Sequence, residues 1–189
     1  MNINEYFSVW NLIRTSGFLG FYFMTLSLSL GLCSSLYVMK KKKALLVSLH
    51  QTSSWYGLLT IIFHTVLIWQ DQYVPYSLGE LFIPFYAENE PVYSALGTLS
   101  FYLFFMVIGS SDFFIKKLGL KIWKKIHLAV IPAWVFMMIH GLAIGTDSTE
   151  PWALFLYASG SSLIIVLGFI RYLESSMVRQ SANRQKPSK

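Results

Sequence analysis

The chain has little charge and almost no cysteine. Of its 189 residues 13% are charged, whereas 54% are apolar and 17% are aromatic. Soluble globular domains carry about 25% charged residues, so this composition excludes an ordinary soluble domain. The single cysteine, Cys33, excludes a disulfide framework, a thiolate metal cluster and covalent attachment of a cofactor through a Cys-x-x-Cys-His motif.

Long apolar stretches dominate what is present. Each is apolar on all sides for about 20 residues, which is enough to cross a membrane as a helix. In lipid, a single segment satisfies its own backbone hydrogen bonds only as a helix. Five such segments lie at 16–39, 44–69, 93–115, 123–145 and 152–173. The sequence therefore predicts an all-α protein, a polytopic bundle of about five transmembrane helices that lies as a multi-pass protein in the cell membrane.

The basic residues set the expected orientation. Fourteen of the 15 lie after the first segment, between the third and fourth, and at or after the end of the fifth (Lys40–Lys43; Lys116, Lys117, Lys121, Lys124 and Lys125; Arg171, Arg179, Arg184, Lys186 and Lys189). Because cytoplasmic loops retain Lys and Arg, we expect the N-terminus outside and the C-terminus in the cytoplasm. The net charge of +6 is then a collar at the inner membrane surface and not a sign of nucleic-acid binding.

Two segments lie outside the apolar stretches. The 70–92 loop, longer than a simple connection needs, has aromatic residues suited to the outer interface and could cover a site there. The 176–189 segment is polar, basic and without apolar periodicity. We therefore divide the chain into a membrane domain, 1–175, and a disordered basic cytoplasmic tail, 176–189.

The four histidines lie on two of the predicted helices. His50 and His64 are in the second segment, and His127 and His140 are in the fourth. These two helices are expected to run in the same direction, so His50 and His127 lie near the inner surface and His64 and His140 near the outer one. The steps along each helix correspond to about 21 Å and about 19–20 Å. Two histidine pairs can thus face each other at two matching depths.

This separation excludes one zinc or copper site built from all four histidines, since such ligands lie about 2 Å from a single ion. It suits two haems, because haem iron accepts an imidazole on each face. Without a covalent motif both haems would be b-type. On an ideal helix His127 and His140 would point about 140° apart. Pro132 lies between them and predicts a kink or a change of winding there.

Other interpretations of these residues stay open. The histidines could instead be hydrogen-bonded to neighbouring carbonyls or form a proton path. Gly57, midway between His50 and His64, could let a porphyrin approach the backbone or could serve helix packing alone. Arg14, at the outer end of the first segment, could pair with a propionate of the outer haem or reach lipid headgroups.

Two stretches resemble a known family. They are HQTSSWYGLLTIIFH at 50–64 and IWKKIHLAVIPAWVFMMIHGL at 122–142. Their paired spacings, fourteen and then thirteen residues, and Trp55 five residues after the first histidine resemble the ferric-reductase-like transmembrane domain. NADPH oxidases, eukaryotic ferric reductases and the membrane subunit of a bacterial methionine-sulfoxide reductase system share this domain. The resemblance covers residues 12–173.

The resemblance implies a function and a ligand set. His50 and His127 would ligate the inner haem, and His64 and His140 the outer one. Six spans are common in the family, against five predicted here. Oxidases also carry a cytoplasmic flavin domain, for which the tail leaves no room, so the expected electron donor is a separate cytoplasmic flavoprotein with FAD or FMN, or a membrane quinol. The expected acceptor is extracytoplasmic ferric iron or a partner reductase.

Three functions compete at this point. The first is an oxidoreductase that passes electrons from a flavoprotein through two haems to an outer acceptor. The second is a cytochrome-b subunit that takes electrons from quinol. The third is a small membrane transporter or assembly scaffold with structural histidines. Only the first two predict b-type absorption bands in the purified protein.

Overall fold

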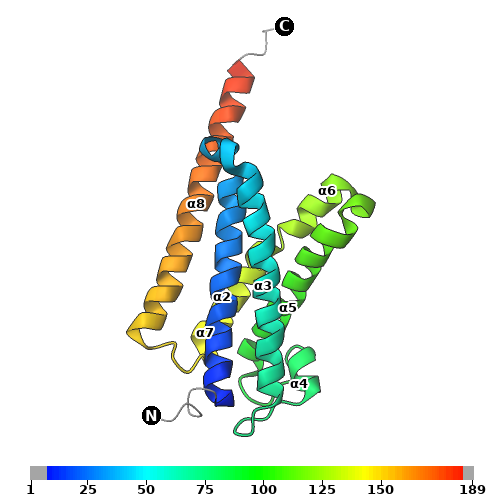
Figure 1. Ribbon diagram of the computed structural model, residues 1–189, viewed down its shortest axis with the longest axis vertical. Helices are drawn as coiled ribbons and strands as arrows, with labels where there is room; N and C mark the ends of the chain where they lie inside the picture. Colours follow the sequence, from blue (N-terminus) through cyan, green and yellow to red (C-terminus); the bar gives the residue numbers. More distant parts are fainter. Residues whose placement is uncertain (1–7, 185–189) are drawn as a thin grey trace.

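A computed structural model describes residues 8–184, and every regular element in that range is a helix (Figure 1). The elements are α2 (Val9–Ser34), the 3-10 helix η1 (Tyr37–Lys42), α3 (Lys43–Trp69), α4 (Leu78–Phe82), α5 (Pro91–Gly109), the π-helical turn η2 (Ser110–Phe114), α6 (Ile115–His127), α7 (Val130–Ile144) and α8 (Pro151–Arg184). The prediction of an all-α helical membrane bundle is confirmed.

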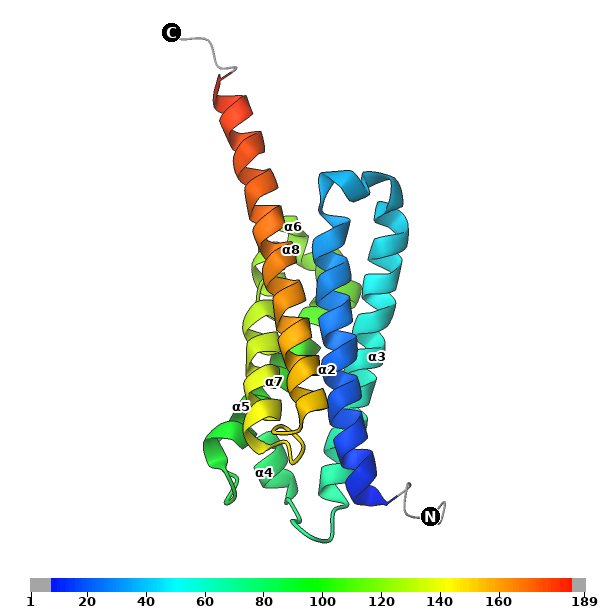
Figure 2. The same cartoon turned by 90° about the vertical axis from the view of Figure 1, so that its left-hand side faces the viewer.

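The long helices alternate in direction between two ends of the bundle. One end carries η1, α6 and the lysines of 40–43 and 116–125, and we call it the lysine-rich end. The other end carries α4 and the 145–150 connection, and we call it the loop end (Figures 1 and 2). Both α3 and α7 run from the lysine-rich end to the loop end (Figures 1 and 2). The two histidine-bearing segments are therefore parallel, as the sequence predicts.

Three helical stretches are long and apolar enough to cross a membrane on their own, namely Val9–Ser34, Pro91–His127 and Pro151–Val178. The other two predicted segments are also helical but fall short of these criteria. α7 is apolar yet only 15 residues long, and α3 has 27 residues but carries two histidines and several other polar side chains. In the bundle, α3 packs against α2, and α7 packs against α5.

Helix ends differ from the predicted boundaries where local chemistry overrides the apolar pattern. α2 begins at Val9 because Ser8 caps it, its hydroxyl accepting from the Asn11 N–H at 3.3 Å. α8 continues to Arg184, so residues 176–184 of the predicted disordered tail are helical. Neither glycine nor proline interrupts residues 169–184. Residues 185–189 lie outside the described range.

The fourth predicted segment is broken in two. α6 ends at His127 and α7 begins at Val130. Two hydrogen bonds in the turn between them span three residues instead of the four of an α-helix: Ala129 N–H donates to the Ile126 carbonyl at 2.9 Å, and Ile131 N–H donates to the Leu128 carbonyl at 3.1 Å. Pro132 has no N–H with which to continue the α-helical pattern to Leu128. The change of winding predicted from Pro132 is confirmed, and the ideal-helix angle between His127 and His140 does not apply.

An apolar core fills the middle of the bundle. It joins five helices (Phe21, Met24 and Leu28 of α2, Leu58 of α3, Phe104 and Ile108 of α5, Ala133 and Trp134 of α7, Tyr157 of α8). Two buried hydrogen bonds tie α7 to its neighbours. The Trp134 indole N–H donates to Thr25 Oγ1 at 2.9 Å, and the Ser100 hydroxyl donates to the Ala133 carbonyl at 2.8 Å.

We expect Thr25→Val to destabilise the protein because it leaves the buried Trp134 N–H without an acceptor. Interhelical hydrogen bonds in membranes contribute roughly 0.6–2 kcal/mol, and the loss should lie in that range in a denaturant titration of the detergent-solubilised chain. In a Trp134→Phe background the same substitution should cost clearly less, since the donor is already gone. Equal costs in both backgrounds would contradict this account.

Candidate functional site

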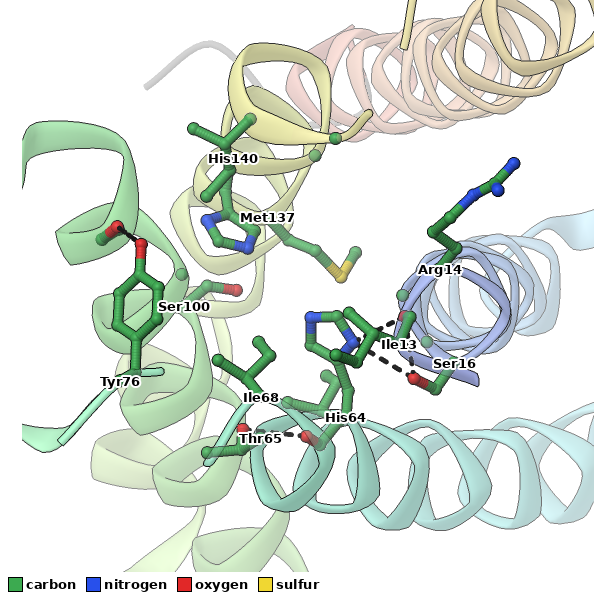
Figure 3. A pocket seen from close by; sticks show the side chains of 18 of the residues that line it. Ile13, Arg14, Ser16, His64, Thr65, Ile68, Tyr76, Ser100, Met137 and His140 are labelled. Carbon is green, nitrogen blue, oxygen red and sulfur yellow. Dashed lines mark hydrogen bonds between the residues drawn. The ribbon is translucent and has the colours of Figure 1, made fainter. Parts of the chain in front are cut away.

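The structure brings the four histidines together as two pairs, one near each end of the bundle. Near the lysine-rich end the ring centroids of His50 and His127 are 6.1 Å apart and the ring planes are inclined by 75°. Toward the loop end, His64 and His140 both line one cavity, and their rings point into it (Figure 3). All four side chains are half-buried. The core described above lies between the two levels.

The cavity at the loop end has a volume of about 590 Å³. Besides the two histidines its wall includes Arg14 and Gly17 of α2 and Gly97 of α5. Residues of the 70–92 segment complete the wall (Asp71, Val74, Tyr76, Glu80, Leu81, Phe82, Asn89 and Glu90). This segment thus lines part of the cavity, and its role as a cover of the site stays a prediction.

On α3, both imidazoles are anchored to the backbone of α2. His50 Nδ1 lies 2.8 Å from the Ser27 carbonyl oxygen, and His64 Nδ1 lies 2.9 Å from that of Ile13. A carbonyl can only accept, so each Nδ1 carries the proton and donates it. The two carbonyls are fourteen residues apart, as are the two histidines. The antiparallel helices therefore repeat one contact at two heights.

The same contact recurs on the other helix pair. His140 Nδ1 of α7 donates to the Tyr93 carbonyl of α5 at 2.9 Å. In each of these three cases Nδ1–H is committed to a neighbouring helix, so the lone pair of the imidazole is left on Nε2. A metal-bound histidine has this arrangement, in which the second ring nitrogen fixes the tautomer and the orientation of the ring.

A glycine lies four residues after each accepting carbonyl: Gly17, Gly31 and Gly97. Residues i and i+4 lie on the same helix face, so a ring that reaches carbonyl i covers the backbone at i+4. A Cβ at Gly17 or Gly31 would come within 3.3 and 3.2 Å of the facing imidazole, and one at Gly97 within 2.7 Å. Gly97 is thus required for the close approach of its ring, and at Gly17 and Gly31 a Cβ would crowd the ring.

The fourth histidine departs from this pattern. The equivalent carbonyl on α5 is Val107, fourteen residues after Tyr93, and the residue four positions later is Ser111 instead of glycine. The Ser111 hydroxyl donates to the Val107 carbonyl at 2.7 Å, and His127 Nδ1 lies 3.4 Å from Ser111 Oγ. A serine hydroxyl of the π-helical turn therefore stands between this imidazole and the carbonyl.

The arrangement suits a cofactor held by two histidines. Within residues 8–184 no three His, Cys, Asp or Glu side chains gather to hold a metal ion. Haem iron needs only two axial ligands from the protein. Two imidazoles bound to one metal from opposite sides through bonds of about 2 Å have ring centres roughly 6 Å apart. The distance between the His50 and His127 rings matches this value.

Arg14 lies at the cavity wall but already has a partner. Its Nε donates to Asp147 Oδ2 at 2.7 Å, and its Nη2 forms an ion pair with the same oxygen. The contact links α2 to the 145–150 connection. Further N–H groups of the guanidinium are available in principle to a second anion, so the pairing of Arg14 with a propionate stays a prediction.

Gly57 and Trp55 lie between the two histidine levels on α3. A Cβ at Gly57 would come within 3.0 Å of Met24 Sδ, so this glycine lets α2 and α3 pack closely. That is the helix-packing role considered above, and a role beside a cofactor stays a prediction. The Trp55 indole N–H donates to Asp112 Oδ2 at 2.5 Å, which joins α3 to the π-helical turn.

Comparison with known proteins agrees with this geometry. The model of the ferric reductase-like transmembrane component family matches residues 16–138, which include His50, His64 and His127, and His140 follows just beyond the match. The chain belongs to this family. As a ferric reductase-like transmembrane component it is a multi-pass, redox-related membrane protein. No curated protein and no solved structure matches the chain.

The anchoring residues of this ferric reductase-like component escaped the sequence analysis. A backbone carbonyl occurs at every position and leaves no signal in a sequence. The glycines do leave one, since Gly17 and Gly31 repeat the fourteen-residue spacing of the histidines. Gly97 of α5 and Ser111 of the following π-helical turn repeat it again.

We expect Gly97→Ala to destabilise the protein because the new methyl group would overlap the His140 ring. Overpacking of this kind costs about 1–3 kcal/mol. Gly168→Ala on α8 is the matched control, because a Cβ there meets nothing within 4 Å, and it should stabilise the helix by about 0.5–1 kcal/mol. Denaturant titrations of both variants measure the difference. Similar behaviour of the two variants would argue against close packing at His140.

Proposed function

We propose that the chain holds two b-type haems non-covalently, one between His50 and His127 and one between His64 and His140, and that it carries electrons across the membrane. The observation that carries this proposal is the commitment of Nδ1 to neighbouring-helix acceptors, which leaves Nε2 of each imidazole for a metal. When bound, such a haem supplies an iron that exchanges one electron and has no open coordination position.

The protein positions the imidazoles and keeps water away from the space between the two pairs. The helices α2, α3, α5 and α7, with the end of α6 that carries His127, hold the imidazoles at two heights. The buried side chains between them, among them Leu58, Phe104 and Trp134, keep water out of the middle of the bundle. The loop-end cavity, partly lined by the 70–92 segment, receives the second pair. The family membership supports a redox role for the whole.

The charge distribution supports a direction of transfer. We propose that the lysine-rich end faces the cytoplasm and that electrons enter there from an acidic flavoprotein with FAD or FMN, or from quinol in the membrane. Exposed lysines on α6 would attract an acidic partner and speed its association. Electrons would leave at the loop end, to ferric iron or to a partner reductase.

Purified protein should show b-type bands in a reduced-minus-oxidised spectrum and should contain two haems per chain. His64→Ala should remove about half of the haem, because the other pair lies in a separate part of the bundle. Gln51→Ala is the control, since Gln51 is an exposed neighbour of His50 on the same helix, and should keep the full content. A purified chain without haem, or one in which His64→Ala retains both haems, would count against the proposal.

Transfer across the membrane can be measured in lipid vesicles that contain the haem-loaded chain and a trapped ferric complex. With reduced flavin outside or quinol in the bilayer we expect reduction of the trapped iron, and the donor that works distinguishes the two entry routes. His50→Ala and His64→Ala should each reduce the rate to that of protein-free vesicles, because both sites are needed in series. An unchanged rate in either variant would contradict a series pathway.

Acidic residues near the cavity would attract cationic ferric complexes to the loop end and so favour their binding there. Glu80 is committed to the loop, since its carboxylate accepts from the Ser77 N–H at 2.8 Å and from the Glu88 N–H at 3.2 Å. These bonds lower the pKa of Glu80 below its ordinary value, the contribution of Ser77 being the largest. The vesicle assay should therefore test Glu88→Gln with Glu90→Gln and leave Glu80 in place. A slower rate with cationic but not anionic complexes is expected.

A further inference from the structure

Ser111 gives one of the four histidines a different hydrogen-bond environment. Three imidazoles donate directly to a helix carbonyl at 2.8–2.9 Å, and for two of them, His50 and His64, a serine hydroxyl lies near Nδ1 as well. Within residues 8–184, the polar contact of His127 Nδ1 is with Ser111 Oγ, at 3.4 Å, and no carbonyl takes its proton. The same oxygen also accepts from the Trp123 indole N–H at 3.0 Å, and its hydrogen is donated to the Val107 carbonyl. Both donors therefore use the same hydroxyl oxygen, one on each of its two lone pairs, and the longer of the two contacts is that of His127.

The side chain of Ser111 also blocks the alternative acceptor. At the other three sites a glycine leaves the ring free to reach the carbonyl four residues earlier. Ser111 has a Cβ at this position, and its hydroxyl already occupies the Val107 carbonyl. The π-helical turn Ser110–Phe114 carries this residue, and π-helical turns are frequent at functional sites.

We propose that Ser111 is a positioning residue that weakens the hydrogen bond of His127 and so raises the reduction potential of the haem held by His50 and His127. A strong hydrogen bond donated by Nδ1–H makes the imidazole a more basic ligand at Nε2. A more basic ligand stabilises ferric over ferrous iron, and second-shell hydrogen bonding is one of the means by which a protein sets a haem potential. This inference rests on the proposed function.

The decisive comparison is between two small substitutions at position 111. Ser111→Ala removes the acceptor of His127 and keeps a Cβ over the Val107 carbonyl, so one of the two haem midpoints should shift upward. Ser111→Gly removes the obstacle as well, so His127 can bond the carbonyl directly as the other histidines do, and the same midpoint should shift downward. A purely structural role would not produce opposite signs.

Ser110→Ala is the matched control. Ser110 is buried in the same turn and donates to the same Val107 carbonyl at 3.0 Å. The Ser110 hydroxyl contacts this carbonyl, whereas the contact with His127 belongs to Ser111. Neither midpoint should move in this variant beyond the scatter of the titration.

The experiment is a potentiometric titration of the haem-loaded, full-length chain, followed by its visible spectrum. Electron paramagnetic resonance of the oxidised protein adds a second readout, in which only one of the two haem signals should change its g values. Unshifted midpoints, shifts of the same sign in both variants, or an equal shift in Ser110→Ala would overturn the role of Ser111. Loss of one haem from both position-111 variants would show a structural role and overturn it as well. A wild-type chain without haem would instead refute the proposed function itself.

Discussion

The hydrogen bond from an imidazole Nδ1 to the backbone of a neighbouring helix is the interaction on which the site depends. In a membrane, an imidazole without a partner carries a high cost, and a helix carbonyl is an acceptor that is always present. The bond favours a small residue one turn beyond the carbonyl, as Gly17, Gly31 and Gly97 show. It therefore sets how closely α3 approaches α2 at both histidine levels, and how closely α7 approaches α5 at the loop end.

The same constraint organises the bundle into two similar halves. In one half, α3 presents His50 and His64 to carbonyls of α2 that lie fourteen residues apart. In the other half, His140 of α7 meets the Tyr93 carbonyl of α5, whereas His127 at the end of α6 meets Ser111 of the π-helical turn. The helices α3 and α7 are parallel to each other (Figures 1 and 2). The imidazoles therefore pair at two heights, His50 with His127 and His64 with His140. An apolar core that includes Met24, Leu58 and Trp134 separates the two levels. One type of contact, used repeatedly, thus produces two sites.

The two ends of the bundle differ, and the difference follows from what surrounds each pair. The loop-end pair opens into a cavity bordered by Arg14 and its partner Asp147 and by the 70–92 segment. The other pair has no glycine beneath His127 and has Ser111 in its place. The histidine-bearing α3 and the short α7, which alone fall short of the criteria for a membrane-spanning helix, pack against α2 and α5. The sites and the packing of these helices therefore depend on each other.

The sequence by itself determined the helical membrane architecture, the pairing of histidines and the change of winding near Pro132, because apolar length, residue spacing and the missing N–H of proline act locally. Only the tertiary structure decided which carbonyl each imidazole meets, that Gly57 packs on Met24, and that Arg14 pairs with Asp147. These contacts join residues far apart in the chain, and which helix faces meet is settled by packing across the whole bundle. Spacing within a helix tells which residues share a depth in the membrane, but not which face of a neighbouring helix they contact.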